Sequence, residues 1–183
     1  MSHYARAPFV LPRASWRETS ILLAVAWLVP GLVHLLPWAG SRPLGVYLLP
    51  VFWTTFLAVY FHGAVLGLLV GLVTPLINLL FTGLPALKNA GPMSLEIFFF
   101  VLVAALLLGR RPGGRFTAPL AWVAGKALAL MVQFFIPALG AVDQPLPHLA
   151  RSVQNGVAGL AVLAVINVLL VTSYPPADAW EKE

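Results

Sequence analysis

Two ionisable side chains, Glu96 and Lys126, lie within long apolar stretches of this sequence. Burying either charge unpaired in a membrane is expensive, so a functional role or a mutual pair is expected. Glu96 lies about one turn from the start of its expected helix, and Lys126 near the middle of the next. The two could pair directly or through a bound ligand. The structural alternative is a buried salt bridge that only fixes the helix register.

Further polar side chains extend this candidate site. Gln133 follows Lys126 by seven residues, two helical turns, so both lie on one face of a helix. Asn78 either faces a cavity or hydrogen-bonds a neighbouring helix. We expect a substrate pocket lined by Asn78, Glu96, Lys126, Gln133, Asn155, His34, Lys88 and Asn89. Lys88 and Asn89 belong to residues 82–92, which would form either a lid over the pocket or an ordinary connector.

Small residues mark a second kind of site. Gly63, Gly67 and Gly71 recur every four residues, a pattern that lets another helix backbone approach closely. Tight packing inside a helical bundle is the favoured interpretation. Asn167, deeper in the last apolar stretch, is interpreted as a polar contact between helices.

The sequence contains no catalytic motif of the metalloprotease, serine hydrolase or nucleotide-binding type. It has no cysteine, its four histidines are scattered, and no aspartate lies in an apolar stretch. We therefore expect no enzyme activity, no metal site and no cofactor in this chain.

The composition is that of an integral membrane protein. Of the 183 residues, 11 are Lys or Arg and 6 are Asp or Glu, which is 9% charged residues, and 60% are hydrophobic. Soluble domains contain about 25% charged residues. The net charge of +5 comes from short basic clusters between apolar runs, so a nucleic acid partner is not favoured. Residues 1–183 are expected to form one membrane domain.

Six spans fit the sequence, because a span needs about 20 apolar residues to cross a hydrocarbon core of about 30 Å. The uncharged stretch 43–87 is about twice that length and must fold back, most simply at His62-Gly63. The expected fold is all-α, a compact bundle of six transmembrane helices near 19–36, 44–61, 63–81, 93–108, 117–139 and 152–174.

Basic residues predict the orientation of these spans. One side carries Arg6, Arg13, Arg17, Arg110, Arg111, Arg115 and Lys182, and the other carries Arg42, Lys88 and Arg151. Both termini are therefore expected in the cytoplasm, in a multi-pass protein of a prokaryotic cell membrane.

Residues 71–108 resemble the substrate-binding S component of energy-coupling factor (ECF) vitamin transporters. The resemblance rests on Thr74-Pro75-Leu76, the turn Leu80-Phe81-Thr82-Gly83-Leu84-Pro85, and Glu96 at the opening of the next helix. It implies an ABC-type importer subunit that captures a vitamin or related micronutrient from outside. It also implies a membrane coupling subunit and two ATPase subunits as partners, which use the ATP.

The family's coupling contact commonly uses Ala-x-x-x-Ala in the first span. The nearest pattern here, Ser20-x-x-x-Ala24, has a serine in place of the first alanine.

Two other functions stay open on the residues alone. One is a membrane scaffold of the cell envelope, whose buried polar groups only specify packing. The other is a small channel or ion-coupled carrier that uses Glu96 as its ion site.

Overall fold

The computed structural model describes residues 16–36, 39, 44–83 and 87–174, and this part of the chain is helical without a strand. It therefore agrees with the all-α prediction. The elements are α1 (Trp16–Leu35), α2 (Leu44–Leu48), α3 (Pro50–His62), α4 (Ala64–Thr82), α5 (Leu87–Arg110), α6 (Thr117–Phe135), the short 3₁₀ helix η1 (Pro137–Leu139), α7 (Pro145–Asn155) and α8 (Val157–Ser173).

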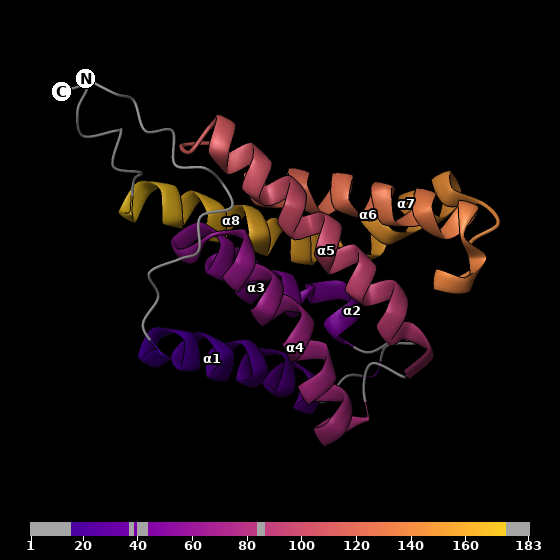
Figure 1. Cartoon of the computed structure of the whole chain (residues 1–183), viewed down its shortest axis with the longest axis horizontal. Coiled ribbons are helices and arrows are strands. Elements are labelled where there is room, and N and C mark those ends of the chain that lie inside the picture. The colour runs from indigo at the N-terminus through magenta and orange to yellow at the C-terminus, as the bar shows by residue number, and fades with distance from the viewer. Residues whose placement is uncertain (1–15, 37–38, 40–43, 84–86, 175–183) are drawn as a thin grey trace.

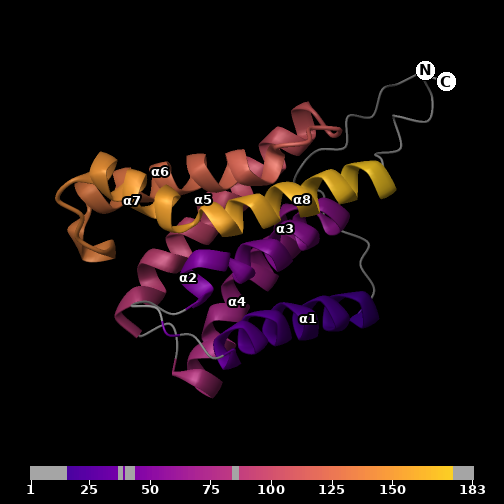
Figure 2. The ribbon, with the colours of Figure 1, turned by 180° about the vertical axis from the view of Figure 1, so that it is seen from behind.

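The longer helices run back and forth between two ends of the molecule (Figures 1 and 2). The loop between α5 and α6 carries Arg111 and Arg115, directly after Arg110, and we call its side the basic end. α1, α4 and α6 run away from the basic end, and α3, α5 and α8 run back toward it (Figure 1). The opposite side, which holds η1 and α7, is called the distal end.

Three of the described helices are long and apolar enough to cross a membrane: Ala64–Phe81, Asn89–Arg110 and Thr117–Phe135. The bent pair of α7 and α8 would make a fourth. These apolar helices indicate a membrane-embedded protein. The helix of the expected span 93–108 begins earlier, at Leu87, and the expected span 117–139 ends as a helix at Phe135 before η1.

The stretch expected as one span at 44–61 is divided between α2 and α3. Leu49, between them, has a left-handed backbone with a φ of 57°, which is rare for a residue other than glycine. The following Pro50 has no backbone N–H to continue the hydrogen bonds of α2, and it begins α3 instead. With 13 residues, α3 is about 20 Å long and by itself shorter than a membrane core.

The last expected span, 152–174, is likewise divided, because α7 and α8 meet at Gly156 with a bend of 68°. A β-carbon on Gly156 would lie 3.3 Å from Leu49 Cδ1 and 3.6 Å from the Trp122 ring. Three residues further on, a β-carbon on Gly159 would lie 2.7 Å from the backbone of Leu48. The α7–α8 bend therefore packs on the α2–α3 break, a contact between segments more than 100 residues apart.

The small-residue stripe packs as expected, with one exception. A β-carbon on Gly67 would collide with Val59 of α3, and one on Gly71 would meet Ile97 of α5 at 2.6 Å. Gly63, in contrast, lies at the turn between α3 and α4 with a φ of 85°. The prediction of a reversal at His62-Gly63 is therefore confirmed, and the reversal depends on a positive φ that glycine adopts without strain.

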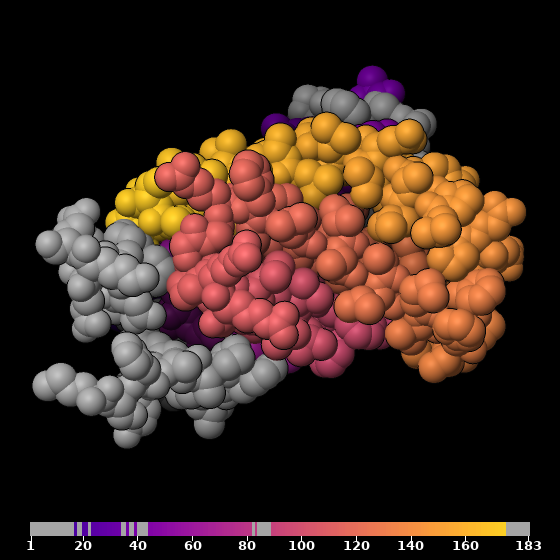
Figure 3. Space-filling model, turned by 90° about the horizontal axis from the view of Figure 1, so that it is seen from above, coloured from indigo at the N-terminus to yellow at the C-terminus, as the bar shows by residue number. Residues whose placement is uncertain are grey.

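The core lies where α3, α5 and α6 meet. The Phe52 ring packs edge-on against Phe100, with ring centroids 5.1 Å apart, and against Trp122 at 6.2 Å. α5 and α6 are in especially close contact, because a β-carbon on Gly125 would lie 2.7 Å from the Phe100 backbone nitrogen. This close contact between Gly125 and Phe100 also places the neighbouring Lys126 of α6 opposite Glu96 of α5. Figure 3 views the face on which α5, α6 and α8 are visible, with α7 at its distal end.

Candidate functional site

Glu96 of α5 and Lys126 of α6 form an ion pair across the close contact between these two helices. Lys126 Nζ donates to Glu96 Oε1 over 2.5 Å, and the side chains are 12% and 16% exposed, respectively. Lys126 follows Gly125 in the chain, and the close approach of Gly125 to Phe99 and Phe100 holds the two helices at pairing distance. Of the two pairings that the sequence allows, the structure contains the direct one. Two nearly buried charges thus neutralise each other without a ligand.

Gln133 lies two turns beyond Lys126 on α6, toward the distal end. Its side chain is 3% exposed, and among the described residues Nε2 has no hydrogen-bond partner. The side-chain amide lies beside Gly140, whose β-carbon would be 3.7 Å from Gln133 Cδ and 2.7 Å from Pro92 Cγ. A buried amide without a partner costs about 1–3 kcal/mol. The Gln133 Nε2 group is therefore a hydrogen-bond donor without a described partner. It lies beside Gly140, after η1, which in turn lies beside Pro92 in the first turns of α5.

Asn78 is buried on α4, with 1% of its surface exposed. It lies two turns beyond Gly71, which packs on Ile97, and so at the depth where α5 begins. Thr74, one turn earlier on this face, donates its hydroxyl to Val70 O of its own helix at 2.7 Å. The polar side of α4 is thus enclosed in the bundle.

The hydrogen bond described for Glu96 and Lys126 joins them to each other, and none is described from them to the remaining expected site residues. Asn89 is exposed on the first turns of α5, and Asn155 is half-buried at the end of α7. His34 and Lys88 lie on α1 and α5, but their side chains fall outside the described part of the structure. Glu96 and Lys126 are therefore the members of the expected site that the structure joins directly, and Gln133 lies two turns away on α6.

Asn167 forms a second polar contact, at the basic end. Its Oδ1 accepts from the Ala118 N–H at 2.7 Å, and its Nδ2 donates to Gly114 O at 2.8 Å. One buried amide of α8 thus satisfies an otherwise free N–H in the first turn of α6 and fixes the preceding loop. The interpretation of Asn167 as a contact between helices is confirmed.

Asn167→Ala is expected to lower the free energy of unfolding by about 1–3 kcal/mol, because it leaves the Ala118 N–H buried without a partner. The midpoint of thermal unfolding in a mild detergent measures the effect. Asn155→Ala, at a half-buried position, serves as the matched control and is expected to change the midpoint little. Equal shifts for the two variants would contradict the assigned role of Asn167.

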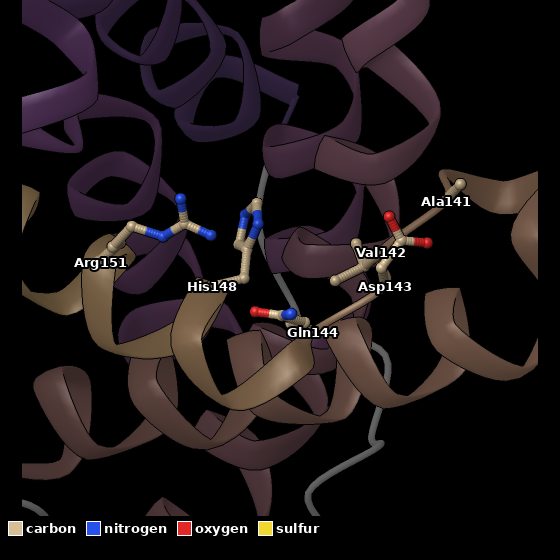
Figure 4. Close-up of a pocket in the computed structure, with 6 residues that line it drawn as sticks. All are labelled: Ala141, Val142, Asp143, Gln144, His148 and Arg151. Atoms are coloured by element: carbon tan, nitrogen blue, oxygen red, sulfur yellow. The ribbon is translucent and has the colours of Figure 1, made fainter.

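A pocket that the sequence interpretation did not include lies at the distal end, next to α7 (Figure 4). It has a volume of about 270 Å³ and is lined by Ala141, Val142, Asp143, Gln144, His148 and Arg151. Gln144 precedes α7, and His148 and Arg151 follow it by four and seven residues, the spacing of one helix face. That spacing was the available signal in the sequence. It was missed because residues 145–155 are mostly outside the apolar stretches.

Comparisons of this chain with protein-family models, with curated proteins and with solved structures find no significant match. The interpretation of its function consequently depends on the geometry above and on the resemblance of residues 71–108.

Proposed function

We propose that this chain is the substrate-binding subunit of an ECF-type importer in a prokaryotic cell membrane. In this proposal it captures a vitamin or related micronutrient at the distal end, which faces outward. It then delivers the ligand inward together with a membrane coupling subunit and two ATPase subunits that hydrolyse ATP. The chain itself performs no chemical step and needs no cofactor.

The observation that carries the proposal is the polar group at the α5–α6 interface. Lys126 uses one of its three donors on Glu96, and two turns away the buried Gln133 Nε2 has no partner among the described residues. A ligand with oxygen acceptors would satisfy this N–H, and a charged group on it would exchange with one partner of the ion pair. The unsatisfied N–H of Gln133 costs free energy while the site is empty, and a ligand that accepts its hydrogen bond would remove this cost. This gain is expected to favour tight binding.

The course of the helices supports a six-span topology. If α2 with α3 and α7 with α8 each count as one broken span, six segments alternate between the basic and distal ends. Broken spans are tolerated in membrane proteins where protein covers the irregular backbone, as Gly159 and Leu48 cover each other here. The arginines of the basic end favour a cytoplasmic position for that end, and hence for both termini.

The segment that resembles the S components also supports the proposal. Gly83 ends α4 with a left-handed φ of 70°, which fits the sharp turn of that segment. Glu96, the third feature of the resemblance, does not open its helix as expected, because α5 begins nine residues earlier at Leu87. Its carboxylate pairs with Lys126 of α6. On α1, Ser20 and Ala24 are exposed, so both are accessible to a partner helix at the proposed coupling site.

Native mass spectrometry of the full chain, purified in a mild detergent from cells grown in vitamin-rich medium, tests the proposal. We expect one organic ligand per chain, which denaturation releases for identification. The double variant Glu96→Gln, Lys126→Met is expected to lose it. A chain that carries no ligand and also gains no mass from an added panel of water-soluble vitamins would overturn the proposal.

A membrane scaffold is the second candidate, because the Glu96–Lys126 pair closes directly and requires no ligand. It predicts a stable protein partner and no bound small molecule. An ion-coupled carrier that uses Glu96 would instead give ion flux in liposomes that contain this chain alone.

A further inference from the structure

The distal pocket contains two opposite charges that do not neutralise each other. Asp143 and Arg151 both line it, and Figure 4 places the Arg151 guanidinium and the Asp143 carboxylate on opposite sides of His148. Within the described part of the chain, no salt bridge within 4.0 Å joins them, and the structure gives the Asp143 carboxylate no hydrogen bond. The pocket therefore offers an anion site and a cation site at its two ends.

The Arg151 side chain is held in position without using its terminal nitrogens. Its Nε donates to Pro147 O at 3.3 Å, one turn earlier on α7, and this is the hydrogen bond that the structure gives to Arg151. No described residue pairs with the two terminal nitrogens, which form the planar fork that binds phosphate or carboxylate oxygens in pairs. On the other side, a carboxylate such as that of Asp143 accepts hydrogen bonds from a primary ammonium group.

Exposed apolar side chains lie near this polar pocket in the chain, before its lining residues and on α7. Phe135, Ile136 and Leu139 precede it in the chain and are 71%, 50% and 42% exposed. Leu146, on the first turn of α7, is 77% exposed on the side of the helix away from Gln144 and His148. A helix with one polar and one apolar face, bent by 68° from the apolar α8, is typical of a segment that lies in the membrane interface.

We propose that this pocket binds the headgroup of a zwitterionic aminophospholipid, such as phosphatidylethanolamine. Arg151 binds the phosphate, Asp143 binds the primary amine, and the acyl chains lie along the apolar side chains before the pocket. A lipid headgroup is favoured over a soluble zwitterion because exposed apolar side chains, up to Leu139, directly precede the first lining residue, Ala141, in the chain and could contact acyl chains. The inference does not depend on the transport proposal, since neither residue belongs to the α5–α6 group.

Native mass spectrometry of the full chain in mild detergent tests the inference. Equal amounts of phosphatidylethanolamine, phosphatidylglycerol and phosphatidylcholine with the same acyl chains are added together. We expect the ethanolamine lipid to be retained about tenfold better than the other two, a factor that corresponds to about 1.4 kcal/mol. The glycerol headgroup lacks the amine, and the choline headgroup cannot donate a hydrogen bond to Asp143.

Variants separate the two ends of the site. Asp143→Asn is expected to abolish the preference for ethanolamine over glycerol lipid, and Arg151→Gln to reduce retention of all three. Arg115→Gln, an exposed arginine at the basic end, is the matched control and should leave both readouts unchanged. If Arg151→Gln does not yield folded protein, Arg151→Lys keeps the charge, removes the fork and is expected to weaken retention in the same direction.

Two results would overturn the inference. One is equal retention of the three lipids by the unmodified chain, or an unchanged preference in Asp143→Asn. The other is displacement of the lipid by soluble glycerophosphoethanolamine at equal concentration, which would identify a free zwitterion as the ligand. We expect no such displacement, because the soluble compound lacks the acyl chains.

Discussion

Lys126→Met is expected to lower the free energy of unfolding by about 3–5 kcal/mol, because it leaves the Glu96 carboxylate nearly buried without its cation. Unfolding in a mild detergent, with increasing amounts of a denaturing detergent, measures the change. Arg115→Met removes an exposed cation outside the helices and serves as the control. A Lys126→Met variant as stable as this control would show that the pair does not contribute to the fold.

The double variant Glu96→Gln, Lys126→Met distinguishes packing from binding. Removing both charges eliminates the unpaired carboxylate, so most of the lost stability should return. A scaffold, which has no small ligand to lose, would then differ from the unmodified chain only in helix packing. A binding subunit would regain stability and still lose its ligand, because the charged partners of that ligand are gone. Stability and ligand occupancy, measured on the same two preparations, therefore separate the two proposed functions.

Gly125→Ala is expected to have the second large effect. Its β-carbon would lie 2.7 Å from Phe100 N and 2.8 Å from Phe100 Cα, and these backbone atoms of α5 have no flexible end that could move aside. Overpacking of this kind costs about 1–3 kcal/mol, and it also moves Lys126 away from Glu96. The thermal midpoint in detergent should fall, and ligand occupancy should fall with it.

Gly31→Ala is the matched control for this variant. Gly31 also lies within a helix, α1, but a β-carbon there would meet nothing within 4 Å. Alanine favours the helix by about 1 kcal/mol over glycine, so the midpoint should stay constant or rise. A fall of equal size in both variants would mean that the loss reflects glycine substitution in general and not the α5–α6 contact.

The sequence by itself determined the features that depend on neighbouring residues. Long apolar runs with few charges predicted helices suited to a membrane, and the glycine at position 63 predicted the reversal between α3 and α4. The isolation of Glu96 and Lys126 in apolar surroundings identified them as partners, because a charge in such a stretch has few other means of compensation. These conclusions depend on composition and on spacing along one helix, and they require no knowledge of segments that are distant in the sequence.

Only the tertiary structure decided where the helices break and which polar groups meet. Leu49 and Gly156 lie in segments whose sequences predict continuous spans. In the structure both helices break there, next to the point where Gly159 packs on the backbone of Leu48. The distal pocket likewise forms where the chain before α7, which carries Asp143, lies beside His148 and Arg151 of α7. The physical reason is that backbone approach and side-chain pairing between distant segments depend on how whole helices pack, which periodicity along a single helix does not encode.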